Sequence, residues 1–240
     1  MLYCLNVKMN IMKNISKLEE KIGIVFKNKD LLRQALVHRS YLNEHRDFKL
    51  DNNERLEFLG DAVLELVSTE YLYSKFPNPE GELTNFRAAL VNGKMLAKIS
   101  GEIGLENYLL MSRGESKDVG KARQYLLANA LEAVIGAIYL DQGYRKSKKF
   151  ISDNILCKMK DVLEEKLYQD PKSKFQEKAQ EKTGVTPSYK VLKEWGPDHN
   201  KHFVIGVYLE DEKIAEGEGT SKQAAQRNAA KEGLEVKKWK

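Results

Sequence analysis

The sequence predicts an all-helical domain followed by a small α+β domain whose elements run in the order α-β-β-β-α. Up to about residue 167, apolar residues recur at helical spacing without the alternation that marks a strand. After Tyr168-Gln169-Asp170-Pro171, three alternating stretches appear between two helical ones. The 240 residues suit one domain of common size and a smaller one, which we expect at 14–166 and 170–240.

Five helices are expected in the first domain. Their approximate ranges are 30–37, 53–74, 83–100, 124–140 and 145–166. Asn53 and Thr84 are suitable N-caps for the second and third, because their side-chain oxygens can accept hydrogen bonds from free backbone N–H groups. Pro77 and Pro79 separate these two helices. The polar stretch 114–120 predicts a loop before the fourth helix.

The second domain begins with a helical stretch at 171–182 and ends with one at 221–236. Alternation between them predicts three strands, at 189–191, 202–209 and 213–219. The connections 196–200 and 210–213 are rich in turn residues. Two helices that flank three strands can both cover one face of an antiparallel sheet, which is the predicted α+β arrangement.

The composition is that of an ordinary soluble protein, with 31% charged residues. A net charge of +5 is a mild preference for polyanions and does not by itself establish nucleic-acid binding. Cys4 and Cys157 have neither zinc nor disulfide spacing and suit a reducing cytoplasm. Because no apolar run approaches the ~18 residues of a membrane span, and residues 1–7 are too short and polar for a signal peptide, no membrane partner is expected.

The most informative stretch is 53–61, which reads NERLEFLGD. Glu57 and Asp61 stand four residues apart and share one helical face, while apolar side chains cover much of the rest. An ionised carboxylate among apolar residues needs a partner, and for bare oxygen ligands the natural one is Mg²⁺ or Mn²⁺. On spacing alone, however, a solvated stripe on an ordinary amphipathic helix is the better interpretation.

A second stretch favours the metal site. Residues 125–140 are apolar nearly all round, which is typical of a buried helix, and Asn129 and Glu132 interrupt them on one face. Small residues on this helix would let another helix approach closely: Ala128, Ala133, Gly136 and Ala137. Two such helices facing each other would build one oxygen-lined metal site from both polar pairs.

These segments resemble the bacterial ribonuclease III family. The resemblance covers the chain from about Leu18 to Trp239 and is carried by six segments: 53–61, 80–91, 126–141, 173–177, 196–199 and 219–225. The first three are similar to the family's signature, the stretch after it and its second acidic helix. The last three are similar to a double-stranded RNA-binding domain. The resemblance implies an endonuclease domain at 14–166 and a double-stranded RNA-binding domain at 170–240.

The resemblance implies an endoribonuclease that cleaves double-stranded RNA and processes ribosomal RNA and other structured precursors. Its cofactor would be Mg²⁺, with Mn²⁺ as a substitute, held by four side chains: Glu57, Asp61, Asn129 and Glu132. The ion would lower the pKa of a bound water for in-line attack on phosphorus, and a second ion would stabilise the leaving 3′-oxygen. Asp61 and Glu132 are the expected catalytic acids, and the products would carry 5′-phosphate and 3′-hydroxyl ends. Glu54 and Glu80 are secondary candidates near the site, with plain surface acids as the alternative.

Asn129 departs from the family pattern, which has Asp at this position. An amide oxygen can still bind Mg²⁺, but it carries no charge and cannot act as a base, so metal affinity should fall. A natural variant that needs more metal, an engineered Asp→Asn change that traps substrate, and a chain that binds RNA without cutting it all remain open. We favour an active enzyme because Glu57, Asp61 and Glu132 are intact, and keep a non-catalytic double-stranded RNA-binding dimer as the alternative. A DNA nuclease is disfavoured, since the second domain suits A-form RNA.

Cutting both strands of a duplex calls for two sites, and a two-fold homodimer supplies them. The resemblance implies that Phe58 inserts into the partner, with a core position as the alternative. His38 is interpreted as a structural histidine, because metal-hydroxide chemistry needs no imidazole.

The second domain offers candidate RNA contacts. Three side chains suit hydrogen bonds to 2′-hydroxyls in the shallow minor groove of an A-form duplex: Ser173, Gln176 and His199. Ser221 and Lys222 place backbone N–H groups and a cation at a helix N-terminus, where phosphates bind. Gln223 and Gln226 stand where such domains often carry positive charge, so we expect weaker phosphate contact.

Overall fold

The computed structural model describes residues 15–117, 119–197 and 201–239. The chain divides into two compact units, the first ending at Glu165 and the second starting at Lys166. Within the described ranges, no helix combines the length and apolar content that crossing a lipid bilayer requires.

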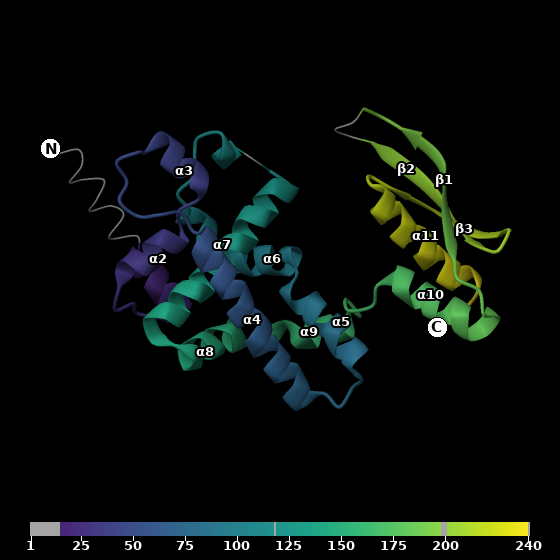
Figure 1. Ribbon diagram of the computed structural model, residues 1–240, viewed down its shortest axis with the longest axis horizontal. Coiled ribbons are helices and arrows are strands. Elements are labelled where there is room, and N and C mark those ends of the chain that lie inside the picture. Colours follow the sequence, from purple (N-terminus) through teal and green to yellow (C-terminus); the bar gives the residue numbers. More distant parts are fainter. Residues whose placement is uncertain (1–14, 118, 198–200, 240) are drawn as a thin grey trace. The chain divides into compact units, whose positions relative to one another are not determined.

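The first unit is built from helices, which confirms the predicted fold class (Figure 1). Residues 15–22 are helical, and the elements that follow are α2 (Lys29–Ala35), α3 (Arg39–Glu44), α4 (Glu54–Lys75), α5 (Glu80–Val91), α6 (Gly93–Ile103), α7 (Lys121–Gln142), α8 (Tyr144–Asn154) and α9 (Met159–Glu164). Short 3₁₀ turns lie at Leu105–Asn107, Glu115–Lys117 and Leu156–Lys158. A single pair of residues, Val37 and Leu110, forms an isolated β-bridge among the described residues.

Two expected long helices are each broken in two. The stretch predicted at 83–100 is divided at Asn92, whose extended backbone ends α5 and whose side chain accepts a hydrogen bond from Met95 N at 3.0 Å, capping α6. The stretch predicted at 145–166 is divided into α8 and α9 by residues 155–158. The short helix α3 is additional to the predicted set.

The two predicted caps are also corrected. Thr84 lies inside α5 instead of at its start, because that helix already begins at Glu80. Asn53 does occupy the N-cap position of α4, but its side chain makes no capping bond. Its amide instead donates to the Ala35 carbonyl at 3.3 Å, which ties the start of α4 to the end of α2.

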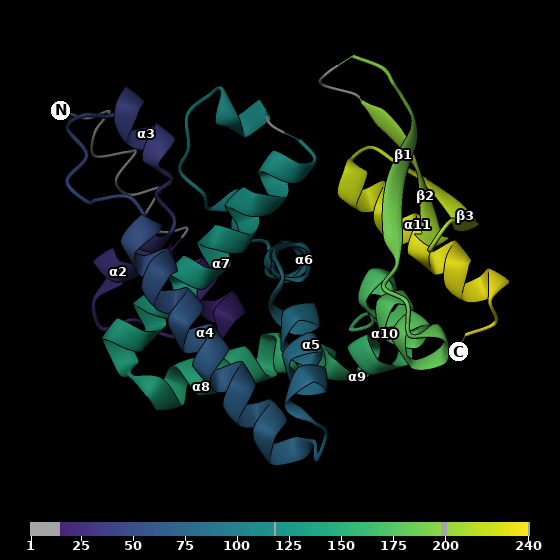
Figure 2. The same cartoon turned by 45° about the vertical axis from the view of Figure 1, so that its right-hand side comes forward.

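Helix α7 forms the centre of the first unit, with α2, α4, α6 and α8 packed against it (Figures 1 and 2). From Leu127 to Ile138 its side chains are buried except for Asn129 and Glu132, which are partly exposed. A helix buried on nearly all sides agrees with its apolar sequence. The two polar side chains therefore project from the core of the unit toward one open edge.

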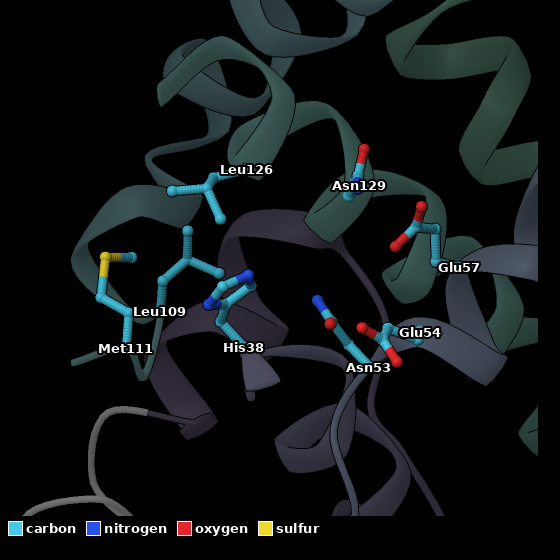
Figure 3. A pocket seen from close by; sticks show the side chains of 8 residues that line it. All are labelled: His38, Asn53, Glu54, Glu57, Leu109, Met111, Leu126 and Asn129. Carbon is cyan, nitrogen blue, oxygen red and sulfur yellow. The ribbon is translucent and has the colours of Figure 1, made fainter. Parts of the chain in front are cut away.

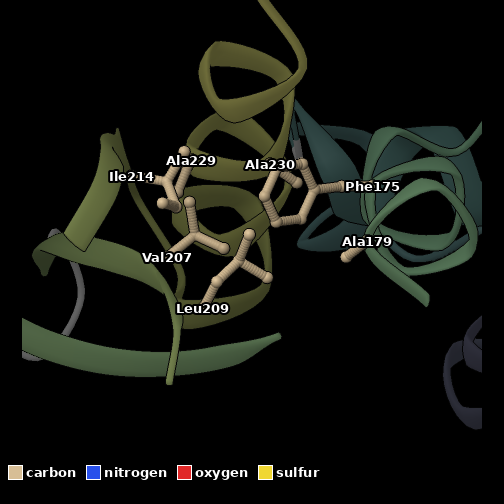
Figure 4. Packing of buried hydrophobic residues seen from close by; sticks show 7 residues of the cluster. All are labelled: Phe175, Ala179, Val207, Leu209, Ile214, Ala229 and Ala230. Carbon is tan, nitrogen blue, oxygen red and sulfur yellow. The ribbon is translucent and has the colours of Figure 1, made fainter. Parts of the chain in front are cut away.

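The second unit has the predicted α-β-β-β-α order. Its elements are α10 (Pro171–Thr183), β1 (Ser188–Trp195), β2 (His202–Leu209), β3 (Glu212–Gly219) and α11 (Lys222–Val236). The strands form an antiparallel sheet in the order β1-β2-β3. Figure 4 shows side chains of both helices packed against the same face of this sheet, in a cluster of Phe175, Ala179, Val207, Leu209, Ile214, Ala229 and Ala230.

Candidate active site

The candidate site forms where α4 crosses α7, and two glycines set the distance between the helices. A Cβ atom on Gly60 would lie 1.7 Å from the Glu132 carbonyl oxygen, and one on Gly136 would lie 2.2 Å from the Leu56 carbonyl oxygen. Both distances are far below van der Waals contact, so any larger residue would force the helices apart. The expected close approach at Gly136 is therefore present, and Gly60 is its counterpart on α4.

This crossing brings the two predicted polar pairs together. The pKa of Glu132 is raised to about 7, first by burial, then by the charges of Asp61 and Glu57. The pKa of Glu57 is also raised, by burial and then by Glu54, while the nearby Asn129 amide opposes the shift and Asp61 adds to it. Because Glu132 responds to Asp61 and Glu57, and Glu57 responds to Asn129, the carboxyl groups and the amide lie within electrostatic reach.

The donor set suits a hard divalent cation. Carboxylate and amide oxygens are the ligands that such ions prefer. The pKa values of Glu57 and Glu132 are raised first by burial and then by neighbouring carboxylates, and a bound cation would oppose both effects. In the described part of the chain, no three His, Cys, Asp or Glu side chains already converge to hold a metal ion. The site therefore offers the right oxygens, which must close in around an ion, with the Asn129 oxygen among them.

A pocket of about 150 Å³ opens beside these acids (Figure 3). One side is apolar and consists of Leu109, Met111 and Leu126. The opposite side is polar and consists of Asn53, Glu54, Glu57 and Asn129. His38 projects between the two sides. The pocket thus shares Glu57 and Asn129 with the candidate metal site.

His38 has two roles in this geometry. It is the N-cap of α3, where its Nδ1 accepts a hydrogen bond from Ser40 N at 3.3 Å, as befits a structural histidine. It also lines the pocket beside the acids, which the sequence did not indicate. No local pattern signals that position, because Leu109 and Asn129 reach it from distant parts of the chain.

The two secondary acids have different outcomes. Glu54 is the first residue of α4 and lines the pocket, where its carboxylate accepts a bond from Asn52 Nδ2 at 3.2 Å and lies 3.6 Å from Arg39. Glu80 starts α5, after the whole length of α4. The helix between Asp61 and the end of α4 is about 21 Å long at 1.5 Å per residue. That Glu80 lies near the site stays a prediction.

Phe58 is not a core residue. Its side chain is 82% exposed, and Leu66 and Tyr73 on the same helix are 58% and 82% exposed. Phe58, Ala62 and Leu66 follow one another at four-residue spacing, so they share one face of α4. An apolar stripe open to solvent is typical of an interaction surface.

The candidate RNA contacts of the second unit gather where α10 meets α11. Lys172 Nζ donates to Gln226 Oε1 at 2.8 Å. Gln226, which stands where such domains often carry a positive charge, thus binds a lysine of the other helix instead. Ser173 and Gln176 are exposed on the first turns of α10, and Lys222 is exposed one turn before Gln226.

Of the remaining two predicted contacts, the structure describes Ser221. Ser221 is the N-cap of α11, and its hydroxyl oxygen accepts a bond from Ala224 N at 3.1 Å. Its oxygen is thus already engaged, although the helix N-terminus that it caps stays available. His199 lies outside the described residues.

Known proteins match both units. A model of ribonuclease-III-like domains matches residues 28–159, and one of the double-stranded RNA binding motif matches residues 171–237. Ribonuclease 3 of Enterococcus faecalis is 47% identical over 220 residues, covering 91% of this chain and 95% of that protein. Ribonuclease 3 of Nitratiruptor is 44% identical over 229 residues, covering 95% and 98%.

A solved structure agrees with these relatives. The nuclease domain of ribonuclease III from Campylobacter jejuni is similar with a TM-score of 0.53 and 48% identity, over 59% of this chain and 92% of that one. The resemblance noted in the sequence is therefore confirmed. Both models match in chain order and the relatives extend over nearly the whole sequence, so the chain belongs to the ribonuclease III family of metal-dependent endoribonucleases.

Proposed function

We propose that this chain cleaves double-stranded RNA by Mg²⁺-dependent phosphodiester hydrolysis, leaves 5′-phosphate and 3′-hydroxyl ends, and processes ribosomal RNA and other structured precursors. The observation that carries the proposal is the contact of α4 and α7 at Gly60 and Gly136, which brings the pair Glu57 and Asp61 opposite the pair Asn129 and Glu132. Relatives named as ribonucleases favour this activity over a dimer that only binds RNA.

Four side chains are proposed as ligands for Mg²⁺, with Mn²⁺ as a substitute: Glu57, Asp61, Asn129 and Glu132. A bound ion supplies an activated water and stabilises the leaving 3′-oxygen. Asp61 is exposed and so accessible to substrate, whereas Glu132 is half-buried at the inner side of the proposed site. Gly60 and Gly136 keep the two pairs at one separation, which orients both acids before RNA binds. Glu54 is a further candidate ligand or positioning group at the edge of the site.

The test is cleavage of a long, perfectly paired, end-labelled RNA across a Mg²⁺ titration. The chain with Asn129 should cut, Asn129→Asp should reach the same rate at lower Mg²⁺, and Glu132→Gln should lose cutting while still binding RNA. Binding without cutting, restored by Asn129→Asp, would replace the proposal with the non-catalytic one. Absence of cutting by both chains at every Mg²⁺ concentration would refute the proposed activity.

A homodimer is part of the proposal, since two sites are needed to cut two strands. The exposed stripe on α4 supports it, and a solved nuclease domain from Campylobacter jejuni is described as having a region involved in dimer formation. Phe58→Glu should convert the dimer to a monomer in sedimentation velocity. Val236→Glu, at an exposed apolar position of the second unit, is the control and should stay dimeric. A dimer that survives Phe58→Glu at micromolar concentration would contradict this interface.

We also propose that the second unit binds the duplex through four residues of α10 and the start of α11, namely Ser173, Gln176, Ser221 and Lys222. The fifth proposed contact, His199, lies outside the described residues. Exposed donors beside a helix N-terminus suit 2′-hydroxyls and phosphates. The proposed domains are 14–166 and 170–240, and limited proteolysis should cut between them. A cytoplasmic location completes the proposal, because the substrate is RNA, and cell fractionation tests it.

A further inference from the structure

The pocket beside the acids has a size and lining that the metal site does not explain. Its volume of about 150 Å³ is far more than one ion or one water needs and leaves room for a small organic group such as a sugar ring. One wall of the pocket is apolar and consists of Leu109, Met111 and Leu126. Metal ions such as Mg²⁺ bind oxygen ligands, so an apolar wall does not contribute to metal binding. A ligand with both a carbon face and polar groups fits this lining better than an ion or water alone.

His38 contributes the polar atom at the middle of the pocket. Its Nδ1 lies 2.8 Å from Ser40 Oγ, 3.3 Å from Ser40 N and 3.2 Å from a Glu115 carboxylate oxygen. These neighbours hold the ring in place and occupy Nδ1 completely. Nε2 has no hydrogen-bond partner among the described residues. An oriented ring with one free nitrogen in a pocket is suited to contact a ligand.

The free groups of the polar wall favour a hydroxyl over a phosphate. The side chain of Asn53 donates through its amide nitrogen to the Ala35 carbonyl, and its Oδ1 accepts no hydrogen bond from the described residues. Glu54 and Glu57 add negative charge, which repels a phosphate but accepts a bond from a hydroxyl. Because Nδ1 accepts the bond from Ser40 N, Nε2 carries the proton of the neutral ring and donates, and a hydroxyl oxygen can accept that bond.

We propose that this pocket binds the ribose of a nucleotide adjacent to the scissile phosphate, and that His38 is a positioning residue whose Nε2 hydrogen-bonds the 2′-hydroxyl of that ribose. The inference rests on the proposed function, since it places the sugar next to the ligands Glu57 and Asn129 that the pocket shares with the metal site. The apolar wall packs against the carbon face of the sugar. The same contact distinguishes RNA from DNA at the point of cleavage, independently of the second unit.

The test asks whether His38 and one 2′-hydroxyl of the substrate contribute to cleavage through the same contact. A hairpin RNA with one mapped cut is prepared with 2′-deoxy substitutions placed singly at the two nucleotides on each side of the scissile bond. His38→Asn removes Nε2 but keeps an acceptor at the N-cap of α3, because Asn is a preferred capping residue. His45→Asn, at the other end of α3 and outside the pocket, is the matched control.

At one of the four positions, we expect the 2′-deoxy change to lower kcat/KM about 3- to 10-fold with the native chain and with His45→Asn, the usual effect of one hydrogen bond. His38→Asn should lower kcat/KM on all-ribose RNA by a similar factor and should be insensitive to the deoxy change at that position. Leu126→Phe, which fills the pocket from the opposite wall, should abolish the same sensitivity without touching His38. A purely structural role would lower activity on every substrate equally.

The outcomes separate the two proposals. If the native chain cuts the hairpin but His38→Asn and Leu126→Phe keep full sensitivity at all four positions, the pocket does not bind the sugar and this inference is wrong. If the native chain does not cut at any Mg²⁺ concentration, the proposed function fails and this inference fails with it. Thermal unfolding of each variant identifies any that has lost its fold.

Discussion

Gly60→Ala tests whether the contact between α4 and α7 builds the site. The added Cβ would start 1.7 Å from the Glu132 carbonyl oxygen, whereas real contacts of this kind essentially never fall below 3.0 Å, so the backbones must separate by roughly 1.3 Å. A backbone carbonyl cannot rotate away as a flexible side chain can. The separation acts on the helix segments that carry Glu57 and Asp61 on one side and Glu132 on the other.

The magnitude is the balance of two opposing effects. Replacing a helical glycine by alanine gains about 0.5–1 kcal/mol through the lower entropy of the unfolded chain. Overpacking costs about 1–3 kcal/mol, and a rigid backbone contact belongs at the upper end. We expect a net loss of about 2 kcal/mol, or roughly 4–8 °C in Tm for a unit of this size. A shift of about 1 Å between reacting groups can lower the rate about 100-fold.

The assay compares thermal unfolding and duplex-RNA cleavage of Gly60→Ala with those of Gly101→Ala. Gly101 lies inside α6 and would present its Cβ to open space, so this variant should be slightly stabilised and fully active. Gly136→Ala should behave like Gly60→Ala, and the double variant should lose less than the sum of the two single losses because both act on one contact. If Gly60→Ala unfolds and cuts like Gly101→Ala, the two helices are not in contact there.

Three further predictions follow from the charges. The pKa of Glu132 in the folded chain, about 7, exceeds the ordinary value of 4.5, so the metal-free protein should lose about 1–2 kcal/mol of stability as pH rises from about 4.5 to 7. Urea unfolding should show this loss, and Glu132→Gln should remove the dependence of stability on pH in this range. Asn129→Asp should lower the metal-free Tm and enlarge the increase that Mg²⁺ produces, measured by scanning calorimetry; an unchanged pair of Tm values would place residue 129 outside the ion's reach. Lys222→Ala should weaken duplex binding equally for unrelated sequences and reduce the salt slope by about 1, whereas a sequence-dependent loss would speak against a phosphate contact.

Sequence reasoning located α4 and α7 within a few residues because both are long and strongly patterned. It missed the break between α5 and α6 although Asn92-Gly93, a common turn dipeptide, was available as a signal. The helical spacing of apolar residues on both sides of Asn92-Gly93 favoured one continuous helix over a turn at this dipeptide. The pairing of Glu57 and Asp61 with Asn129 and Glu132 was predicted because chemistry, not only periodicity, requires polar groups in buried helices to find partners.

Long-range contacts account for what the sequence could not indicate. The partner of Gly136 is a carbonyl on α4, and no local pattern identifies Gly60 as its counterpart. The pocket likewise combines His38 with Leu109 and Asn129, which lie about 70 and 90 residues further along the chain. Glu80, a secondary candidate near the site, begins α5 after the 22 residues of α4. Its place near the site stays a prediction.

The contact between α4 and α7 has two opposing effects on the stability of the fold. The glycine crossing brings the helices close enough for apolar packing, and the same closeness forces Glu57, Asp61 and Glu132 to repel one another. An uncharged Asn129 reduces that repulsion, because its amide favours the ionised form of Glu57 instead of opposing it. Compared with an aspartate, Asn129 also lacks a negative charge that would attract a metal ion. Asparagine at this position therefore stabilises the metal-free fold and lowers metal affinity. The Mg²⁺ concentration that cleavage requires, compared with that of Asn129→Asp, measures how much affinity is lost.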